Sequence, residues 1–179
     1  MSLAAAKAYL RVDDAAEDGL IATLITAARL HVEAITGRAL VAQSWRLVLD
    51  AWPVCRSIEL PIGPMLSLTV ITAYDAEGDE HLVPLAQFIP ETRVSPARLL
   101  LPLVIAGMPD LRERRGLEID YVAGFGETGD DVPADVTHAL QVLIAYWFEH
   151  RDAVIVAGSG AVVPAGFDRL VSPYKRVRL

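Results

Sequence analysis

The chain has 179 residues, of which 53% are hydrophobic and 22% charged, which is enough for one domain with its own core. This composition excludes an intrinsically disordered chain, and the positive mean hydropathy of +0.37 hints at apolar surface buried against other copies or partners. The formal net charge of −7 argues against a protein that wraps DNA or RNA, whose affinity depends on neutralising phosphates.

The first part of the chain has helical patterning. Ser2 is expected to cap a first helix over Leu3–Leu10. A longer helix should follow, because apolar residues recur at helical spacing between positions 20 and 35. Gly37 stands where the C-terminus of a helix favours glycine.

The middle of the chain changes to short strands separated by prolines and turns. No helix-length pattern lies between these strands, so the sequence excludes a parallel sheet built from βαβ units. The strands are expected at residues 45–52, 58–60, 66–74, 81–83, 98–101 and 117–122.

Helical patterning returns at Pro133, a residue favoured in the first turn of a helix. A short helix is expected from Phe167 until shortly before Pro173. The sequence therefore predicts an α+β fold: a small antiparallel bundle of two N-terminal and two C-terminal helices with a β-rich insertion in the middle. We expect a single domain over 1–179, with helical parts at about 2–38 and 132–172 and the insertion at about 41–126.

The sequence Gly124-Phe-Gly126-Glu-Thr-Gly129 matches the glycine pattern of a dinucleotide-binding loop and follows a predicted strand. However, the next helix begins beyond the last glycine, and Glu127, Asp130 and Asp131 place negative charge where a pyrophosphate would bind. A glycine-rich turn is the better interpretation. We therefore expect no bound cofactor here.

Other catalytic or metal-binding patterns are weak. The four histidines show no metal-ligand spacing, and His31 and His150 fall near apolar helix faces. The single Cys55 excludes an intrachain disulfide and a cysteine-based zinc cluster, and we expect it to be a quiet core or strand thiol. The sequence assigns no catalytic, cofactor-binding or metal-binding residue, and no uncharged stretch approaches the roughly 20 residues of a membrane-spanning helix.

The last residues of the sequence are basic, since no acidic residue follows Asp168. Tyr174, Lys175, Arg176 and Arg178 could form a docking segment in which arginines and an aromatic ring contact an acidic partner surface. A solvated basic tail is an equally good interpretation.

Taken in chain order, several short motifs resemble those of the phage head–tail connector family, found in tailed phages, prophages and gene transfer agents. Each motif is weak alone, but the ordered set spans nearly the whole chain. They are Leu10-Arg-Val-Asp13, Thr36-Gly37-Arg38, Gln43-Ser-Trp45, Ile58-Glu-Leu-Pro61 with Gly63-Pro64, Tyr121 with Gly124-Phe-Gly126, Val132-Pro133, Tyr146-Trp-Phe-Glu149 and Pro173-Tyr-Lys-Arg-Val-Arg-Leu179.

The resemblance implies a structural virion protein, not an enzyme. It implies a homo-oligomeric ring, dodecameric on the portal, that extends the DNA channel and docks a tail-side head-completion protein. Double-stranded DNA would pass without specific binding, and no membrane would be involved. The protein would be found at the head–tail junction of the virion and, during assembly, in the bacterial cytoplasm. Two alternatives remain: a nucleotide-binding enzyme using Gly124–Gly129, and a monomeric adaptor module.

Overall fold

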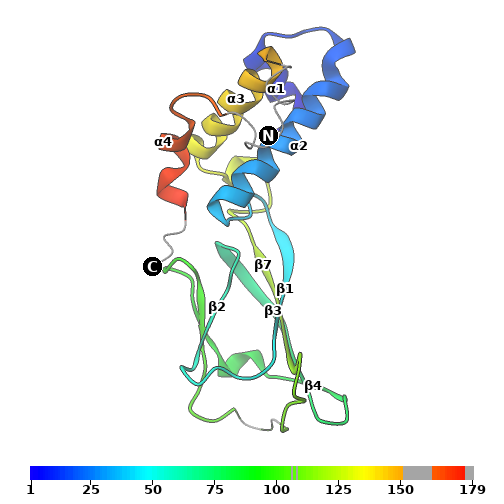
Figure 1. Cartoon of the computed structure of the whole chain (residues 1–179), viewed down its shortest axis with the longest axis vertical. Helices are drawn as coiled ribbons and strands as arrows, with labels where there is room; N and C mark the ends of the chain where they lie inside the picture. Colours follow the sequence, from blue (N-terminus) through cyan, green and yellow to red (C-terminus); the bar gives the residue numbers. More distant parts are fainter. Residues whose placement is uncertain (106, 108, 151–162, 176–179) are drawn as a thin grey trace. The chain divides into compact units, whose positions relative to one another are not determined.

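The computed structural model describes residues 1–105, 107, 109–150 and 163–175 (Figure 1). The chain forms two compact units. The helical unit comprises Met1–Leu40 and Thr128–Leu179, and the β unit comprises Val41–Glu127. Helices and antiparallel sheets are both present, which confirms the α+β class.

The helical unit contains the two N-terminal helices that the sequence predicts. Helix α1 (Leu3–Leu10) begins at Ser2, whose hydroxyl oxygen accepts a hydrogen bond from the Ala5 backbone N–H at 3.2 Å. Helix α2 (Asp18–Thr36) ends at Gly37, which adopts the left-handed conformation with φ of +66°. These capping residues confirm both the elements and their ends.

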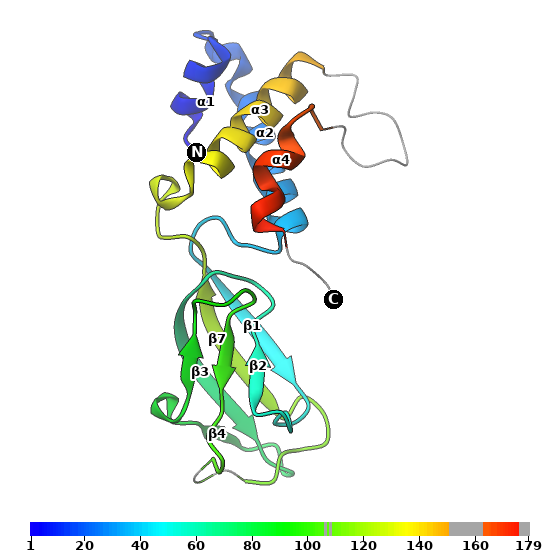
Figure 2. The same ribbon diagram turned by 90° about the vertical axis from the view of Figure 1, so that its left-hand side faces the viewer.

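The later helices lie alongside these two. Helix α3 (Ala134–Glu149) packs against α1 and α2, and α4 (Phe167–Val171) packs against α3 (Figure 2). Short 3₁₀ turns, η1 (Ala15–Glu17), η3 (Gly129–Asp131) and η5 (Ser172–Tyr174), precede α2 and α3 and follow α4.

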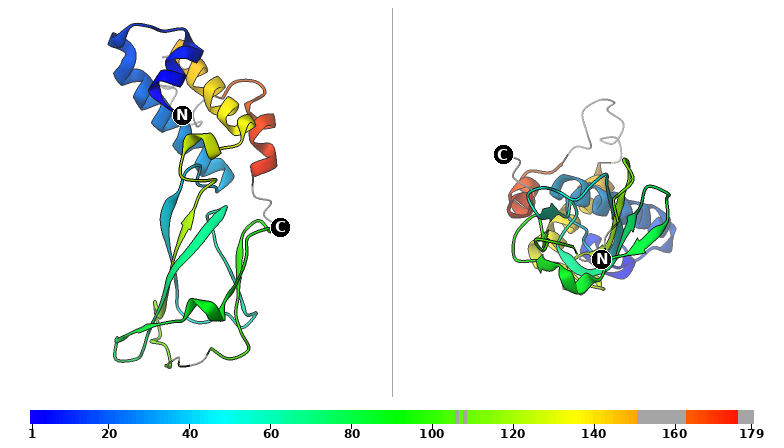
Figure 3. Two further views of the ribbon diagram at one scale, coloured as in Figure 1. Left: turned by 180° about the vertical axis from the view of Figure 1, so that it is seen from behind. Right: turned by 90° about the horizontal axis from the view of Figure 1, so that it is seen from below.

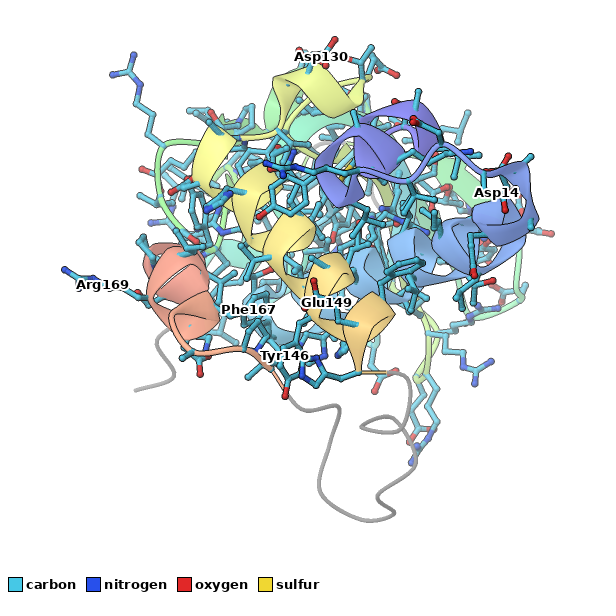
Figure 4. The ribbon with its side chains drawn as sticks, turned by 90° about the horizontal axis from the view of Figure 1, so that it is seen from above. Asp14, Asp130, Tyr146, Glu149, Phe167 and Arg169 are labelled. Carbon is cyan, nitrogen blue, oxygen red and sulfur yellow. The ribbon has the colours of Figure 1, made fainter. Side chains whose placement is uncertain are left out.

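The core of the helical unit is built from one face of each helix. Burying one such Leu, Ile, Val or Phe side chain stabilises the fold by about 1.5–3 kcal/mol. Figure 4 shows α4 beside α3, with Arg169 pointing away from both. The buried side chains include Ile21, Leu24, Val32, Val136, Leu143, Trp147, Phe167 and Val171.

By length and composition alone, Ala15–Thr36 could also cross a membrane. A single such segment is a weak indication, because core helices pass the same test. In this structure one face of α2 packs against α1 and α3, and another side of the helix stays exposed.

The β unit consists of two antiparallel sheets that face each other (Figures 1 and 3). The larger sheet has the strand order β1 (Gln43–Leu49), β7 (Leu117–Ala123), β3 (Met65–Tyr74) and β4 (Glu80–Leu82). The smaller has the order β2 (Ser57–Glu59), β6 (Arg98–Leu100) and β5 (Ile89–Glu91), and the 3₁₀ turn η2 (Leu85–Gln87) follows β4.

The inner faces of the two sheets form the second core. Alternate residues of β7 are buried, as period-2 alternation of a half-buried strand requires. The Tyr121 hydroxyl accepts a hydrogen bond from the Ile62 backbone N–H at 3.2 Å, so this buried ring reaches from β7 to the chain after β2. The other inward side chains include Ile58, Leu60, Ile71, Leu99, Leu117 and Ile119.

Four sequence interpretations need correction. Cys55 is neither a core nor a strand thiol: it is exposed in the turn before β2, where its Sγ donates to the Ser57 carbonyl oxygen at 3.4 Å. His150 is the C-cap residue of α3 and is exposed, with its ring stacked on that of Tyr146 at a centroid distance of 4.4 Å. The strand expected at 45–52 ends at Leu49, and β5 was missed because Pro90 indicated a loop; an edge strand tolerates proline, and β5 is an edge strand.

Candidate interaction surfaces

The glycine run that follows β7, from Gly124 to Gly129, begins where two backbone segments pass close to each other. A Cβ added to Gly124 would lie 2.5 Å from the Val41 carbonyl carbon, so only glycine fits between these two passing segments. The Gly124 N–H donates to the Pro64 carbonyl oxygen at 2.9 Å, and the Gly126 carbonyl accepts from Ala42 N–H at 2.8 Å. The backbone groups of this run therefore serve the packing of the β unit.

One acidic residue beyond the glycines, Asp131, forms a capping box with Thr128 at the start of η3. Asp131 accepts hydrogen bonds from the backbone N–H of Thr128 at 2.8 Å and from its hydroxyl at 2.9 Å. These bonds hold the pKa of the Asp131 carboxyl below its usual range, and the backbone bond has the larger effect. Asp131 is thus a capping carboxylate.

The titratable groups that the structure describes do not gather into a chemical centre. Among the described residues, no three or more His, Cys, Asp or Glu side chains lie close enough together to hold a metal ion. His31 lies between the rings of Trp147 and Phe167, with centroid distances of 5.9 and 5.8 Å. Burial lowers the pKa of His31, which favours a neutral packing residue.

Tyr174, the first residue of the predicted docking segment, is fixed within the helical unit. Its hydroxyl donates to Asp135 Oδ1 at 2.8 Å, and its carbonyl oxygen accepts from Arg38 Nε at 3.0 Å. The Arg38 guanidinium also lies 5.8 Å from the centre of the Tyr174 ring. Burial, and next the hydrogen bond to Asp135, raise the pKa of the Tyr174 hydroxyl.

The local sequence explains why these three residues meet. Gly37 ends α2 and places Arg38 directly after it, while Pro133 precedes α3 and places Asp135 in the first turn. The 3₁₀ turn η5 follows α4 and carries Tyr174. Tyr174 was predicted as a site residue, but Arg38 and Asp135 were not assigned as its partners, because pairing across 136 and 39 residues leaves no spacing signal.

Of the other predicted docking residues, the structure describes Lys175. Lys175 Nζ lies 2.7 Å from Asp168 Oδ1 in an exposed ion pair. Such a pair contributes little to stability. Arg176 and Arg178 lie outside the described residues, as does most of the apolar segment 153–166.

One side of α2 is exposed and carries no charge. We call this surface the α2 face; Leu30 is 53% exposed there. Its residues also line a shallow hollow of about 450 Å³. The α2 face comprises Ala22, Thr23, Thr26, Ala27 and Leu30.

The outer face of the larger sheet is charged instead. Arg46 on β1 contacts Asp120 through two hydrogen bonds of 2.6 and 2.7 Å and Glu118 at 2.9 Å. These carboxylates raise the pKa of Arg46, and Arg46 lowers that of Asp120. On the same face, the guanidinium of Arg112 lies 4.1 Å from the centre of the Tyr74 ring.

A second exposed apolar group lies on the β unit, in the turn after β1 and the loop after β6. Val54 is 99% exposed, Leu103 85% and Val104 78%. Isolated exposed apolar residues are common, but three this exposed suit a contact surface better than a catalytic cleft.

No family model and no curated protein matches the sequence. Solved structures do match over its whole length. A chain in the neck of an empty gene transfer agent (GTA) particle, computed with C6 symmetry, is 27% identical with a TM-score of 0.79; the match covers 100% of this chain and 91% of that one. A chain from the virion of the native GTA particle gives 27% identity and 0.80 at the same coverage.

A third match is a chain in the neck of the native GTA particle, computed with C12 symmetry. It is 28% identical with a TM-score of 0.75, covering 99% of this chain and 89% of that chain. The chain therefore shares its fold with chains from the neck and the virion of gene transfer agent particles. These matches confirm the resemblance to the head–tail connector family that the ordered motifs predict.

Proposed function

We propose that the chain is a head–tail connector that forms a homo-oligomeric ring beneath the portal, extends the DNA channel and docks tail-side proteins. The observation that carries this proposal is the match, over the full chain, to chains of GTA particle necks with C6 and C12 symmetry. Twelve copies are expected on the portal. The protein acts at the head–tail junction of the virion after passing through the bacterial cytoplasm during assembly, and it performs no catalysis.

In this proposal the two units together make one connector domain. The helical unit, as a small antiparallel bundle, provides the body of the ring, and the β unit is an insertion between α2 and α3. A ring of identical copies needs heterologous contacts, in which one face of a copy meets a different face of the next. We assign the α2 face to such a contact with a second copy, because it is uncharged and continuous along a helix.

The charge of the chain fits a channel for DNA. A net charge of −7 gives little electrostatic attraction to phosphates, so passing DNA would not be held by counterion release. The basic segment, Tyr174–Leu179, suits an acidic protein surface better than DNA, and we assign it to contact with the portal.

Co-sedimentation with the portal protein of the same particle tests the proposal. The chain is expected to sediment with portal rings in the absence of DNA. A chain that stays in the supernatant at every concentration tested would contradict the proposal, and an association that requires DNA would favour a DNA-binding module instead.

Changes in the basic segment test whether it makes the contact with the portal. Deleting Tyr174–Leu179 is expected to abolish portal binding while the fold persists, but this deletion also removes the contacts of Tyr174 with Arg38 and Asp135. The double variant Arg176→Ala, Arg178→Ala removes both arginine charges, leaves Lys175 and the contacts of Tyr174 in place, and is expected to weaken portal binding.

A further inference from the structure

The start of the basic segment is tied to two helices that are distant from it in the sequence. Tyr174 contacts Arg38, after α2, through its carbonyl oxygen and Asp135, in α3, through its hydroxyl. We propose that Arg38, Asp135 and Tyr174 form a latch that fixes the point at which the basic segment leaves the helical unit, and that they are positioning residues for portal docking. This inference rests on the proposed function.

The burial pattern shows why a latch is needed at this point. Val171 is fully buried, but Ser172, Pro173 and Lys175 after it are exposed. Half-buried Tyr174 therefore makes the contacts that hold the chain beyond α4 against the unit, together with the exposed Lys175–Asp168 pair. That pair is too accessible to solvent to fix the chain by itself.

The contacts of Tyr174 are directional, which apolar packing is not. A hydrogen bond requires a donor–acceptor distance near 3 Å and a near-linear angle, and both bonds here meet that distance. Each also involves a charged group, the Arg38 guanidinium or the Asp135 carboxylate, and such bonds are stronger than neutral ones. One bond holds the backbone and the other the side chain, so the direction of the chain at Tyr174 is defined.

This geometry fixes the start of the basic segment, at Tyr174 and Lys175. In a ring, each copy would offer its basic segment from an equivalent point. A segment whose start is already held loses less conformational entropy on docking than one whose start must also be ordered.

A double-mutant comparison separates positioning from general stability. Tyr174→Phe removes the hydroxyl bond to Asp135 and keeps the ring. It is expected to weaken portal binding about tenfold in the otherwise unchanged protein and to have no further effect in the Arg176→Ala, Arg178→Ala background. Asp135→Asn, which removes the charge of the acceptor, provides a second variant if Tyr174→Phe fails to fold.

The outcomes distinguish the latch from the function on which it rests. If Arg176→Ala, Arg178→Ala weakens binding and Tyr174→Phe does not, the latch is wrong and the docking proposal stands. Equal weakening by Tyr174→Phe in both backgrounds would show a merely structural role and overturn the latch. If the unchanged protein does not bind portal, or if removing both arginines has no effect, the proposal that the basic segment docks to the portal fails. The latch then fails with it.

Discussion

Asp131 shows at the scale of one residue how an acidic side chain that could suggest chemistry serves the fold. The Thr128 hydrogen bonds lower its pKa, so the stabilisation is present when the carboxylate is charged. It should be lost as the pH falls below the usual aspartate pKa of about 4 and through the lower folded-state value. In Asp131→Asn the free energy of unfolding is therefore expected to fall less steeply as the pH is lowered through the acid range.

Asp130→Asn is the matched control for this prediction. It makes the same change in charge one residue away and leaves the acceptor of the Thr128 bonds in place. Urea unfolding measured between pH 5 and pH 2.5 compares the two variants. If the free energy of unfolding falls equally steeply with pH in the original protein and in Asp131→Asn, the cap does not contribute to stability.

Tyr174 shows what sequence reasoning can and cannot reach at this scale. Its aromatic ring beside basic residues marked it as a contact residue, and its type alone gave no hint of its partners. A spacing motif works within one helix or loop, where geometry is periodic. The Arg38–Tyr174 contact joins opposite ends of the chain, so it depends on how three helices pack.

At the scale of elements, the glycine run gives the sharpest prediction. In Gly124→Ala the new Cβ would lie 2.5 Å from a backbone atom of Val41, and backbone cannot move aside as a flexible side chain can. The substitution should lower the free energy of unfolding by about 1–3 kcal/mol or more. Denaturation followed by circular dichroism measures this.

Gly19→Ala is the control, because nothing lies within 4 Å of its added Cβ and the residue is in α2. Alanine favours the middle of a helix over glycine by roughly 0.5–1 kcal/mol, and Gly19 is in the first turn of α2, so this variant should be at least as stable as the original chain. Two destabilising results of similar size would mean that close packing at Gly124 is not the cause.

The elements themselves were largely predictable from the sequence, and the exceptions have physical causes. Caps and apolar spacing defined both ends of α1 and the C-terminal end of α2, because these signals are local. The strand β5 was missed since Pro90 usually breaks strands, and nothing in the sequence marks it as an edge position. Cys55 was wrongly placed because a cysteine is more often buried than exposed.

The α2 face carries a prediction about assembly. Leu30→Glu places a charge on the surface assigned to the contact between copies, where it would be desolvated without a partner. It should reduce self-association on the portal and leave the folded monomer intact. Leu82→Glu is the control, since Leu82 is also an exposed leucine but lies on β4 of the β unit.

Chemical cross-linking on portal rings provides the comparison. The number of linked copies is expected to fall for Leu30→Glu and to stay unchanged for Leu82→Glu. If Leu30→Glu gives as many linked copies as the original chain, the contact between copies lies on a surface other than the α2 face.

At the scale of the whole molecule, the account depends on a chain that is acidic and rich in apolar residues, yet ends in a basic segment. The proposed connector uses each of these properties. The apolar surface contacts neighbouring copies, the net negative charge keeps the attraction to DNA phosphates weak, and the basic segment contacts the portal. The fold class and the family resemblance came from the sequence. The division into two compact units and the fixed position of Tyr174 required the structure.

The central claim, a ring assembled on the portal, is tested most directly by the mass of the complex. Light scattering of portal rings with excess chain should show an added mass of twelve times 19.4 kDa, or another fixed multiple set by ring symmetry. The chain alone is expected to show either this ring or a monomer that awaits its template. An added mass of one copy, or one that grows without limit as more chain is supplied, would contradict the account.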